Sequence, residues 1–228
     1  MKKENTPAIG VQSINLSDFE TQTKLRVFLI AKEFAEGFKL ISAHKLSVTF
    51  FGSTRFAEDN KYYIQARRVA GALVKIGYTV VTGGGPGIME AANRGAKEAG
   101  GASIGFSIQL PNEQSVNPYV TENVSFHHFF SRKVILSFSA ESYVYFPGGI
   151  GTLDEFFEII TLIQTKKIPH VPVILVGTEY WKPIISFMRA NLLKKFKTID
   201  AKDLELFTVT DSDAEIIKIV RSAPKRKE

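Results

Sequence analysis

Short apolar runs alternate with stretches of helical periodicity along most of the 228-residue chain. The runs that have the length of strands cover 46–52, 78–85, 102–108, 124–129, 142–149, 171–177 and 204–210. The helices predicted between and after them cover 59–76, 86–99, 131–139, 152–164, 179–195 and 211–222. Such alternation is typical of a mostly parallel sheet, because each parallel strand needs a crossover connection that packs on the sheet. We therefore predict a doubly wound α/β fold, with a mostly parallel sheet of about seven strands and helices on both faces.

One long amphipathic helix at 17–43 precedes the first strand and stands apart from this alternation. The segment 109–123 is rich in proline and asparagine and is predicted as a loop. No internal repeat of fixed period is visible. We expect an N-terminal tail and helical extension at 1–45, a single domain at 46–222 and a basic tail at 223–228.

The charge of the chain changes this picture little. The formal net charge is +6, and part of it comes from the lysines at 194, 195 and 197 and from the C-terminal tail. These basic clusters are not interleaved with aromatic residues in the way that a single-stranded nucleic-acid site needs. We therefore expect no nucleic-acid partner, although a basic balance suits a small phosphorylated ligand.

The absence of cysteine excludes disulfides, thiolate metal sites and a cysteine nucleophile. His127 and His128 have no second cluster of carboxylates and histidines beside them in the sequence, so no metal is expected. No apolar run approaches the roughly 20 residues of a membrane-spanning helix. The first ten residues also lack the apolar core of a signal peptide. We expect a cytoplasmic protein without a membrane partner.

Glycines form the carboxyl ends of three of the predicted strands, at Gly52, at 83–85 and at 148–149. Ligands of doubly wound sheets bind beyond the carboxyl ends of the strands, so these loops are expected to converge at one edge. Glycine lets the backbone approach a ligand closely, and the first amides of the following helix favour an anion. Each loop taken singly is equally consistent with a tight turn between a strand and a helix.

Two familiar nucleotide motifs are absent from these loops. Neither the 83–85 loop nor the 148–149 loop matches G-x-G-x-x-G followed by an acidic residue about 20 positions on. The sequence GGGPG also lacks the lysine of a P-loop. We therefore favour a mononucleotide or a sugar phosphate as the ligand over NAD or ATP hydrolysis.

Two adjacent carboxylates, Asp154 and Glu155, follow the third glycine loop at the start of a predicted helix. Thr152 and Glu155 form the T-x-x-E pattern of a capping box, in which the glutamate accepts a hydrogen bond from the backbone at the helix start. The alternative is chemical. Beside a nucleotide, a carboxylate can stabilise the positive charge that develops on the ribose as the glycosidic bond breaks, and it can activate water. The residues alone leave both interpretations open.

Three motifs together resemble the LONELY GUY family, often labelled "possible lysine decarboxylase". The motifs are GGGPGIMEAANRGA, FFSRK and PGGIGTLDE, and they match the family signature PGGxGTxxE with an upstream arginine–lysine pair. The resemblance covers about residues 46–192. It implies a Rossmann-like fold and a homodimer. It also implies hydrolysis of a nucleoside 5′-monophosphate, such as AMP or N6-modified AMP, to free base and ribose 5-phosphate without a cofactor.

The resemblance assigns roles by position. Arg132 and Glu155 match the two catalytic residues of the family. The residues implied to bind substrate are Gly52, Ser53, Gly84, Gly85, Glu90, Lys133, Gly148, Gly149, Gly151 and Thr152. The chain departs from the common pattern at 129–131, where Phe-Phe-Ser replaces Met-x-Glu, and at Asp154, where glutamate is common. These departures concern the base pocket more than the glycosidic chemistry.

Two rival functions are weighed beside this one. A non-catalytic nucleotide or cofactor carrier can use the same loops, although the presence of both Arg132 and Glu155 favours an enzyme. The sequence SAHK at 42–45 resembles the lysine motif of pyridoxal-phosphate-dependent decarboxylases. Those enzymes are far larger, and here the tetrapeptide ends a predicted helix, so we reject that activity.

Overall fold

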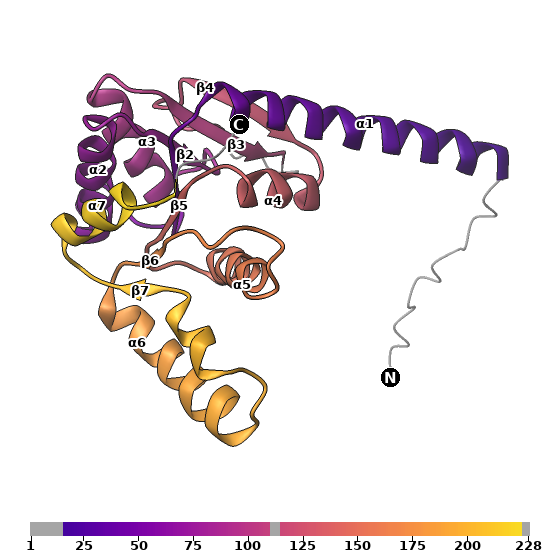
Figure 1. Cartoon of the computed structure of the whole chain (residues 1–228). Coiled ribbons are helices and arrows are strands. Elements are labelled where there is room, and N and C mark those ends of the chain that lie inside the picture. Colours follow the sequence, from indigo (N-terminus) through magenta and orange to yellow (C-terminus); the bar gives the residue numbers. More distant parts are fainter. Residues whose placement is uncertain (1–15, 110–114, 225–228) are drawn as a thin grey trace, which may run out of the picture.

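The structure is a computed structural model and describes residues 16–109 and 115–224 (Figure 1). Within these residues, seven strands form one central sheet. The strands are β1 (Ser47–Phe51), β2 (Thr79–Thr82), β3 (Ser103–Ile108), β4 (Glu122–Phe126), β5 (Ser142–Tyr145), β6 (Val173–Leu175) and β7 (Thr208–Val209). Every neighbouring pair is parallel. The predicted doubly wound α/β fold is confirmed. Residues 1–15 of the predicted N-terminal tail and extension (1–45) and residues 225–228 of the predicted basic tail (223–228) lie outside the described residues.

The strand order reverses once, between β1 and β5. Across the sheet the order is β4-β3-β2-β1-β5-β6-β7, so the chain moves outward from β1 to β4 and then returns to the other side of β1. Phe51 pairs with Tyr145 at the carboxyl ends of the two central strands. The loops after these two strands diverge at such a reversal and leave the crevice in which open α/β sheets bind ligands.

Helices cover both faces of the sheet (Figure 1). On one face lie α2 (Lys61–Val74), α3 (Ile88–Glu98) and α7 (Asp213–Arg221), and on the other lie α4 (Phe129–Ser137) and α5 (Ile150–Gln164). Each face has its own apolar core, because side chains along a strand alternate between the two faces. Phe50 joins the core under α2 and α3, and its neighbour Phe51 joins the core under α4 and α5.

Helix α1 (Leu16–Ala43) precedes the sheet and extends well beyond the body of the molecule (Figure 1). The side chains at 20–29 are exposed. Closer to β1, Ile41 is buried and Phe34 and Leu40 pack against the core that contains α4 and α5. The predicted helix at 17–43 is therefore present, and its C-terminal half is the part that packs on the domain.

Two predicted elements near the C-terminus differ from the observed ones. The helix predicted at 179–195 is α6 (Thr178–Phe187), and it continues as a π-helix (Met188–Lys195). The strand predicted at 204–210 is wrong over most of its length, since a 3₁₀-helix (Ala201–Glu205) leads into the two-residue strand β7. A capping box causes this turn, with the Asp200 N–H donating to the Asp203 carboxylate at 2.8 Å.

Candidate active site

Two of the three glycine loops meet at the reversal between β1 and β5. The Ser53 N–H, in the loop after β1, donates to the Pro147 carbonyl, in the loop after β5, at 3.0 Å. The Ile88 N–H, at the start of α3, donates to the Ser53 carbonyl at 3.0 Å. The segment after β2 is thereby held at the same edge of the sheet.

A hollow of about 610 Å³ lies between these loops. Its lining contains the predicted residues Gly52, Ser53, Gly148, Gly149, Gly151 and Thr152. Tyr180 forms one side, and its hydroxyl donates to the Gly148 carbonyl at 2.8 Å. The volume falls within the roughly 300–1,000 Å³ of small-molecule sites.

Helix α5 begins at this hollow, with Gly149 as its N-cap residue. Among the described residues, no side chain caps this helix end, so its first backbone N–H groups lack a capping acceptor. A Cβ placed on Gly149 or Gly151 would meet nothing within 4 Å, which leaves open space beside the backbone. The arrangement suits a phosphate group, because a helix N-terminus attracts an anion.

Of the two interpretations of Thr152 and Glu155, the structure excludes the capping box. That pattern requires Thr152 to stand just outside the helix, but α5 begins about one turn earlier, at Ile150. Thr152 is therefore a helical residue, and Glu155 lies in the second turn. The Glu155 side chain is directed toward Arg132 instead of the helix start.

Arg132 from α4 and Glu155 from α5 approach each other below the surface. Arg132 Nη1 lies 3.6 Å from Glu155 Oε1, and the two side chains are only 11% and 16% exposed. Arg132 Nε donates to the Phe106 carbonyl at 2.7 Å, which anchors the guanidinium to β3. At 3.6 Å the two charges attract each other without forming a hydrogen bond.

The enclosure of this pair changes how its carboxyl group titrates. Burial raises the pKa of the Glu155 carboxyl to about 7, although the positive charge of Arg132 acts in the opposite direction. Burial also lowers the pKa of Arg132, against the attraction of Glu155. A carboxyl group with a pKa near neutrality can accept and release a proton during a reaction.

The neighbouring carboxylate, Asp154, has different surroundings. Lys133 Nζ lies 2.8 Å from Asp154 Oδ2 and 3.5 Å from Glu158 Oε2. The Asp154 side chain is 53% exposed. The two adjacent carboxylates that the sequence singled out are thus a solvated, paired Asp154 and an enclosed Glu155.

The glycine loop after β2 packs directly against Arg132. A Cβ on Gly83 would lie 2.1 Å from Arg132 Nη2, so only glycine leaves room for the guanidinium. The Gly84 carbonyl accepts from the backbone N–H and the side-chain amide of Asn117, at 2.9 and 3.1 Å. Glu90, in the first turn of α3, accepts from the Tyr63 hydroxyl at 2.9 Å.

The predicted residues therefore divide into those that line the hollow and those that do not. Those that do not line the hollow are Arg132, Glu155, Gly84, Gly85, Glu90 and Lys133. Helix α5 joins the groups, because Thr152 lines the hollow and Glu155 lies three residues further, roughly 4.5 Å along the helix axis. An extended ligand that begins at the start of α5 has to follow that direction to reach Glu155.

Sequence reasoning missed residues that hold these groups in place. Asn117 is buried, and its side-chain amide donates to the Gly84 and Gly85 carbonyls at 3.1 and 3.0 Å. Tyr63 supports Glu90, and the Phe106 carbonyl anchors Arg132. Each of these residues contacts a part of the chain that is distant in sequence, so no local pattern indicates its role. An asparagine in a predicted loop was the one hint that the sequence offered.

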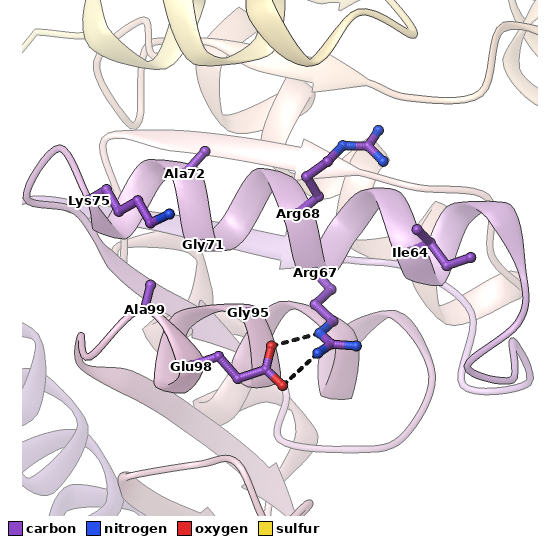
Figure 2. Close-up of a pocket in the computed structure, with 9 residues that line it drawn as sticks. All are labelled: Ile64, Arg67, Arg68, Gly71, Ala72, Lys75, Gly95, Glu98 and Ala99. Atoms are coloured by element: carbon purple, nitrogen blue, oxygen red, sulfur yellow. Dashed lines mark hydrogen bonds and ion pairs between the residues drawn. The ribbon is translucent and has the colours of Figure 1, made fainter.

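A second hollow, of about 480 Å³, lies between α2 and α3 and contains none of the predicted residues (Figure 2). Two of its arginines have acidic partners. Arg67 donates to Glu98 through Nε and Nη2, both at 2.7 Å, and Arg68 pairs with Asp213. We therefore place the candidate site at the glycine loops.

Residues 16–109 and 115–224 contain neither a candidate metal cluster nor a helix that could span a membrane. No three side chains from His, Asp and Glu come together there in a group that could hold a metal ion. In the same residues, no helix combines the length and the apolar character needed to cross a membrane.

Known proteins are similar in sequence to more than half of this chain. The profile of the family described as "Possible lysine decarboxylase" matches residues 89–220. The cytokinin riboside 5′-monophosphate phosphoribohydrolase of Rhodococcoides fascians is 27% identical over 172 residues, which are 70% of this chain and 85% of that protein. The cytokinin riboside 5′-monophosphate phosphoribohydrolase LOG of Oryza sativa subsp. japonica is 28% identical over 157 residues, which are 67% of this chain and 64% of that protein.

Solved structures share the fold. A structural-genomics target superposes with a TM-score of 0.59 at 27% identity, covering 77% of this chain and 98% of the other. The molybdenum cofactor carrier protein of Chlamydomonas reinhardtii superposes with a TM-score of 0.58 at 24% identity, covering 78% and 96%. The second similarity concerns the fold alone.

Proposed function

The chain belongs to the LONELY GUY family, whose profile is described as "Possible lysine decarboxylase", and on this premise we propose that it is a nucleoside 5′-monophosphate phosphoribohydrolase. The proposed substrate is AMP or an N6-modified AMP, and the products are the free base and ribose 5-phosphate. The printed names of the two relatives support the reaction class. The observation that carries the proposal is the enclosed Arg132–Glu155 pair, with Glu155 in the second turn of a helix whose start is suited to an anion.

The phosphate end of the substrate is proposed to bind at the start of α5. Gly148, Gly149, Gly151 and Thr152 supply the backbone amides and a hydroxyl, and Gly52 and Ser53 form the opposite wall of the hollow. The open space beside Gly149 and Gly151 supports this role. A phosphate there also benefits from the partial positive charge of the helix N-terminus.

The glycosidic bond is proposed to lie beside Glu155. An ionised Glu155 accepts a proton from water, the water oxygen bonds to C1′ of the ribose, and the C1′–N bond breaks. The electron pair of the broken bond leaves with the base, which takes up a proton. The same carboxylate stabilises the positive charge that develops on the ribose, and its pKa of about 7 supports its role as a base near neutral pH.

Arg132 is proposed to act on substrate oxygens or on the departing base. Its guanidinium is anchored through Nε to the Phe106 carbonyl, while Nη1 faces Glu155. A rigid, permanently charged fork of donors suits this task. Gly84, Gly85 and Glu90 are proposed to contact the ribose or the base. Lys133, which pairs with Asp154, is proposed to add positive charge beside the bound substrate.

A homodimer is the proposed assembly, supported by an apolar surface next to the site. Phe129, Phe130 and Phe138 on or beside α4 are about half exposed, and Phe38 of α1 and Phe157 of α5 are also exposed. Phe38 and Phe138 contact each other with ring centroids 6.0 Å apart. Exposed aromatic side chains gathered in this way are typical of a protein–protein interface.

A non-catalytic carrier is the second candidate. This candidate is supported by the shared fold with a protein named as a molybdenum cofactor carrier, at a TM-score of 0.58. Both candidates require a nucleotide-like ligand at the glycine loops. Only the hydrolase requires Glu155 to change its protonation state.

The test incubates the purified protein separately with AMP, N6-isopentenyl-AMP, GMP and CMP, and follows free base and ribose 5-phosphate by chromatography. We expect release from at least one adenine nucleotide and no release by the Glu155→Gln variant. Binding measured by calorimetry without release from any nucleotide would replace the hydrolase with the carrier.

A further inference from the structure

Helix α1 brings a buried carboxylate, Glu33, to the side of α4. Glu33 is only 6% exposed and lies one turn before Gly37, which is also buried. A Cβ on Gly37 would meet the Ile135 Cγ1 and Cδ1 atoms of α4 at 2.6 and 2.7 Å, so the two helices cross in close contact there. Residues four apart share a face of a helix, and this places Glu33 on the face of α1 that meets α4.

The Glu33 carboxylate accepts hydrogen bonds from residues just before and within the first turn of α4. Its Oε1 accepts from the His127 N–H at 2.7 Å, and its Oε2 accepts from the Ser131 hydroxyl. The His128 Nδ1 lies 3.2 Å from Oε2. Among the described residues, His128 is the N-cap of α4 and its own side chain makes no capping bond.

Glu33 therefore holds the residues around the start of a helix to which it does not belong. A negative charge is also favourable near the N-terminal end of a helix. Burial acts to raise the pKa of Glu33, but the hydrogen bonds from Ser131, the His127 N–H and His128 bring it below its usual value. The group is thus an anion at neutral pH, which is the charge that a helix start favours.

The turn that Glu33 holds is the turn that presents Arg132. The Arg132 N–H donates to the His128 carbonyl at 3.2 Å and closes the first turn of α4. Ser131, which donates to Glu33, is the preceding residue. A shift of this turn would change the distance from the guanidinium both to the Phe106 carbonyl and to Glu155.

We propose that Glu33 is a positioning residue that fixes the first turn of α4, and through it Arg132, for the reaction proposed above. Glu33 lies outside residues 89–220, where the family profile matches. In this proposal, α1 helps to hold Arg132 in place through Glu33. The geometric part of this proposal, from Glu33 to Arg132, can be tested without any turnover.

The first experiment compares Glu33→Gln with Glu36→Gln. Glu36 is the matched control, because it lies on the same helix with its side chain 51% exposed and only a 3.8 Å pairing to Lys32. With the nucleotide that the protein hydrolyses, we expect Glu33→Gln to lower kcat about 10- to 100-fold, as a misplaced catalytic group does. KM should change less, and Glu36→Gln should behave like the wild type.

The second measurement follows the ¹⁵N NMR signal of Arg132 Nε–H, which donates to Phe106. We expect this signal to shift and to exchange faster with solvent in Glu33→Gln but not in Glu36→Gln. An unchanged signal together with unchanged kcat would overturn the positioning role. If the wild type hydrolyses no nucleotide while the signal still responds to Glu33→Gln, the positioning stands and the proposed reaction falls.

A third variant covers the case in which Glu33→Gln does not fold. Ser131→Ala removes one donor to Glu33 and leaves the buried carboxylate with its backbone partner, the His127 N–H. The same change of the Arg132 signal is expected, in a smaller amount. A folded Ser131→Ala protein with the wild-type signal and the wild-type kcat would contradict the proposal.

Discussion

Two arginine–glutamate pairs in this protein are built from the same side chains and behave in opposite ways. Arg67 and Glu98 bridge α2 and α3 at the surface, with both hydrogen bonds at 2.7 Å and side chains 40% and 43% exposed (Figure 2). Arg132 and Glu155 are enclosed, yet their nearest charged atoms are 3.6 Å apart. The solvent-exposed pair, Arg67 and Glu98, therefore has the shorter contact, although water already stabilises its charges.

This contrast separates a pair that supports structure from a pair that is available for chemistry. The hydrogen bonds from Arg67, with those from Arg94, hold the pKa of Glu98 below its usual value, whereas burial raises the pKa of Glu155 to about 7. A buried pair that served stability alone is expected to close into a bidentate contact, because that contact offsets the desolvation of both charges. Arg132 is held away by its bond to Phe106, so Glu155 keeps a proton that can be exchanged.

The largest expected effect is the loss of turnover in Glu155→Gln. The amide cannot accept a proton or stabilise positive charge, so kcat should fall by roughly 10²- to 10⁴-fold. Nucleotide affinity, measured by calorimetry, should stay close to that of the wild type. Glu98→Gln is the matched control, and it should keep full activity. Equal turnover in wild type and Glu155→Gln would remove the distinction between the two pairs.

Arg132→Met is expected to lower kcat/KM by about 10²- to 10³-fold, the usual cost of removing a charged donor from a reacting centre. It should also move the rise of activity with pH to a higher pH, because Glu155 loses the cation that favours its ionised form. Arg67→Met should change neither quantity. A pH profile of kcat/KM for the three proteins measures both effects, and an unshifted profile for Arg132→Met would argue against the coupling.

The two pairs should give opposite dependence of stability on pH. The folded-state pKa of Glu155, about 7, lies above its unfolded value, so the native state binds more protons between the two. The stabilisation is complete below about pH 4.3 and is lost as pH rises through 7, by on the order of 3 kcal/mol. Glu98 has a lowered pKa, so its smaller contribution is lost as pH falls.

Urea unfolding at several pH values between 4 and 8 measures this difference. Glu155→Gln should remove the decrease in unfolding free energy between about pH 4.3 and 7, and it should be more stable than the wild type above pH 7. Activity should rise over the same range in which this stabilisation is lost, since the ionised form is the proposed base. If the unfolding free energies of the wild type and of Glu155→Gln changed in parallel with pH, the pKa of Glu155 would be the same in the folded and unfolded states.

The smallest expected effect is on the surface pair itself. Arg67→Ala and Glu98→Ala, combined in a double-mutant cycle, should give a coupling energy of about 0.2–1 kcal/mol, because both side chains are well solvated. Thermal or urea unfolding of the four proteins measures it. A coupling of several kcal/mol would show that the short hydrogen bonds between Arg67 and Glu98 stabilise the protein despite the exposure of both side chains to water, and would contradict this expectation.

The fold could be predicted from the sequence because its signals are local. Alternating apolar runs and helical periods predicted the parallel sheet, and the glycines after three strands predicted which edge carries the loops. The same local patterns misled at two places. Thr152 and Glu155 matched a capping box, but α5 starts earlier, and the apolar run at 204–210 is largely a 3₁₀-helix and a turn.

By itself, the sequence determined the order of strands and helices, the glycine loops and the residue types available for chemistry. These follow from backbone preferences and from periodicity within one segment. Only the tertiary structure decided that Asp154 is solvated and Glu155 enclosed, and that Arg132 is anchored to Phe106. It also decided that Glu33 binds the His127 N–H, 94 positions away and just before α4. Burial and electrostatic interactions depend on which distant segments meet in space, and no local pattern records that.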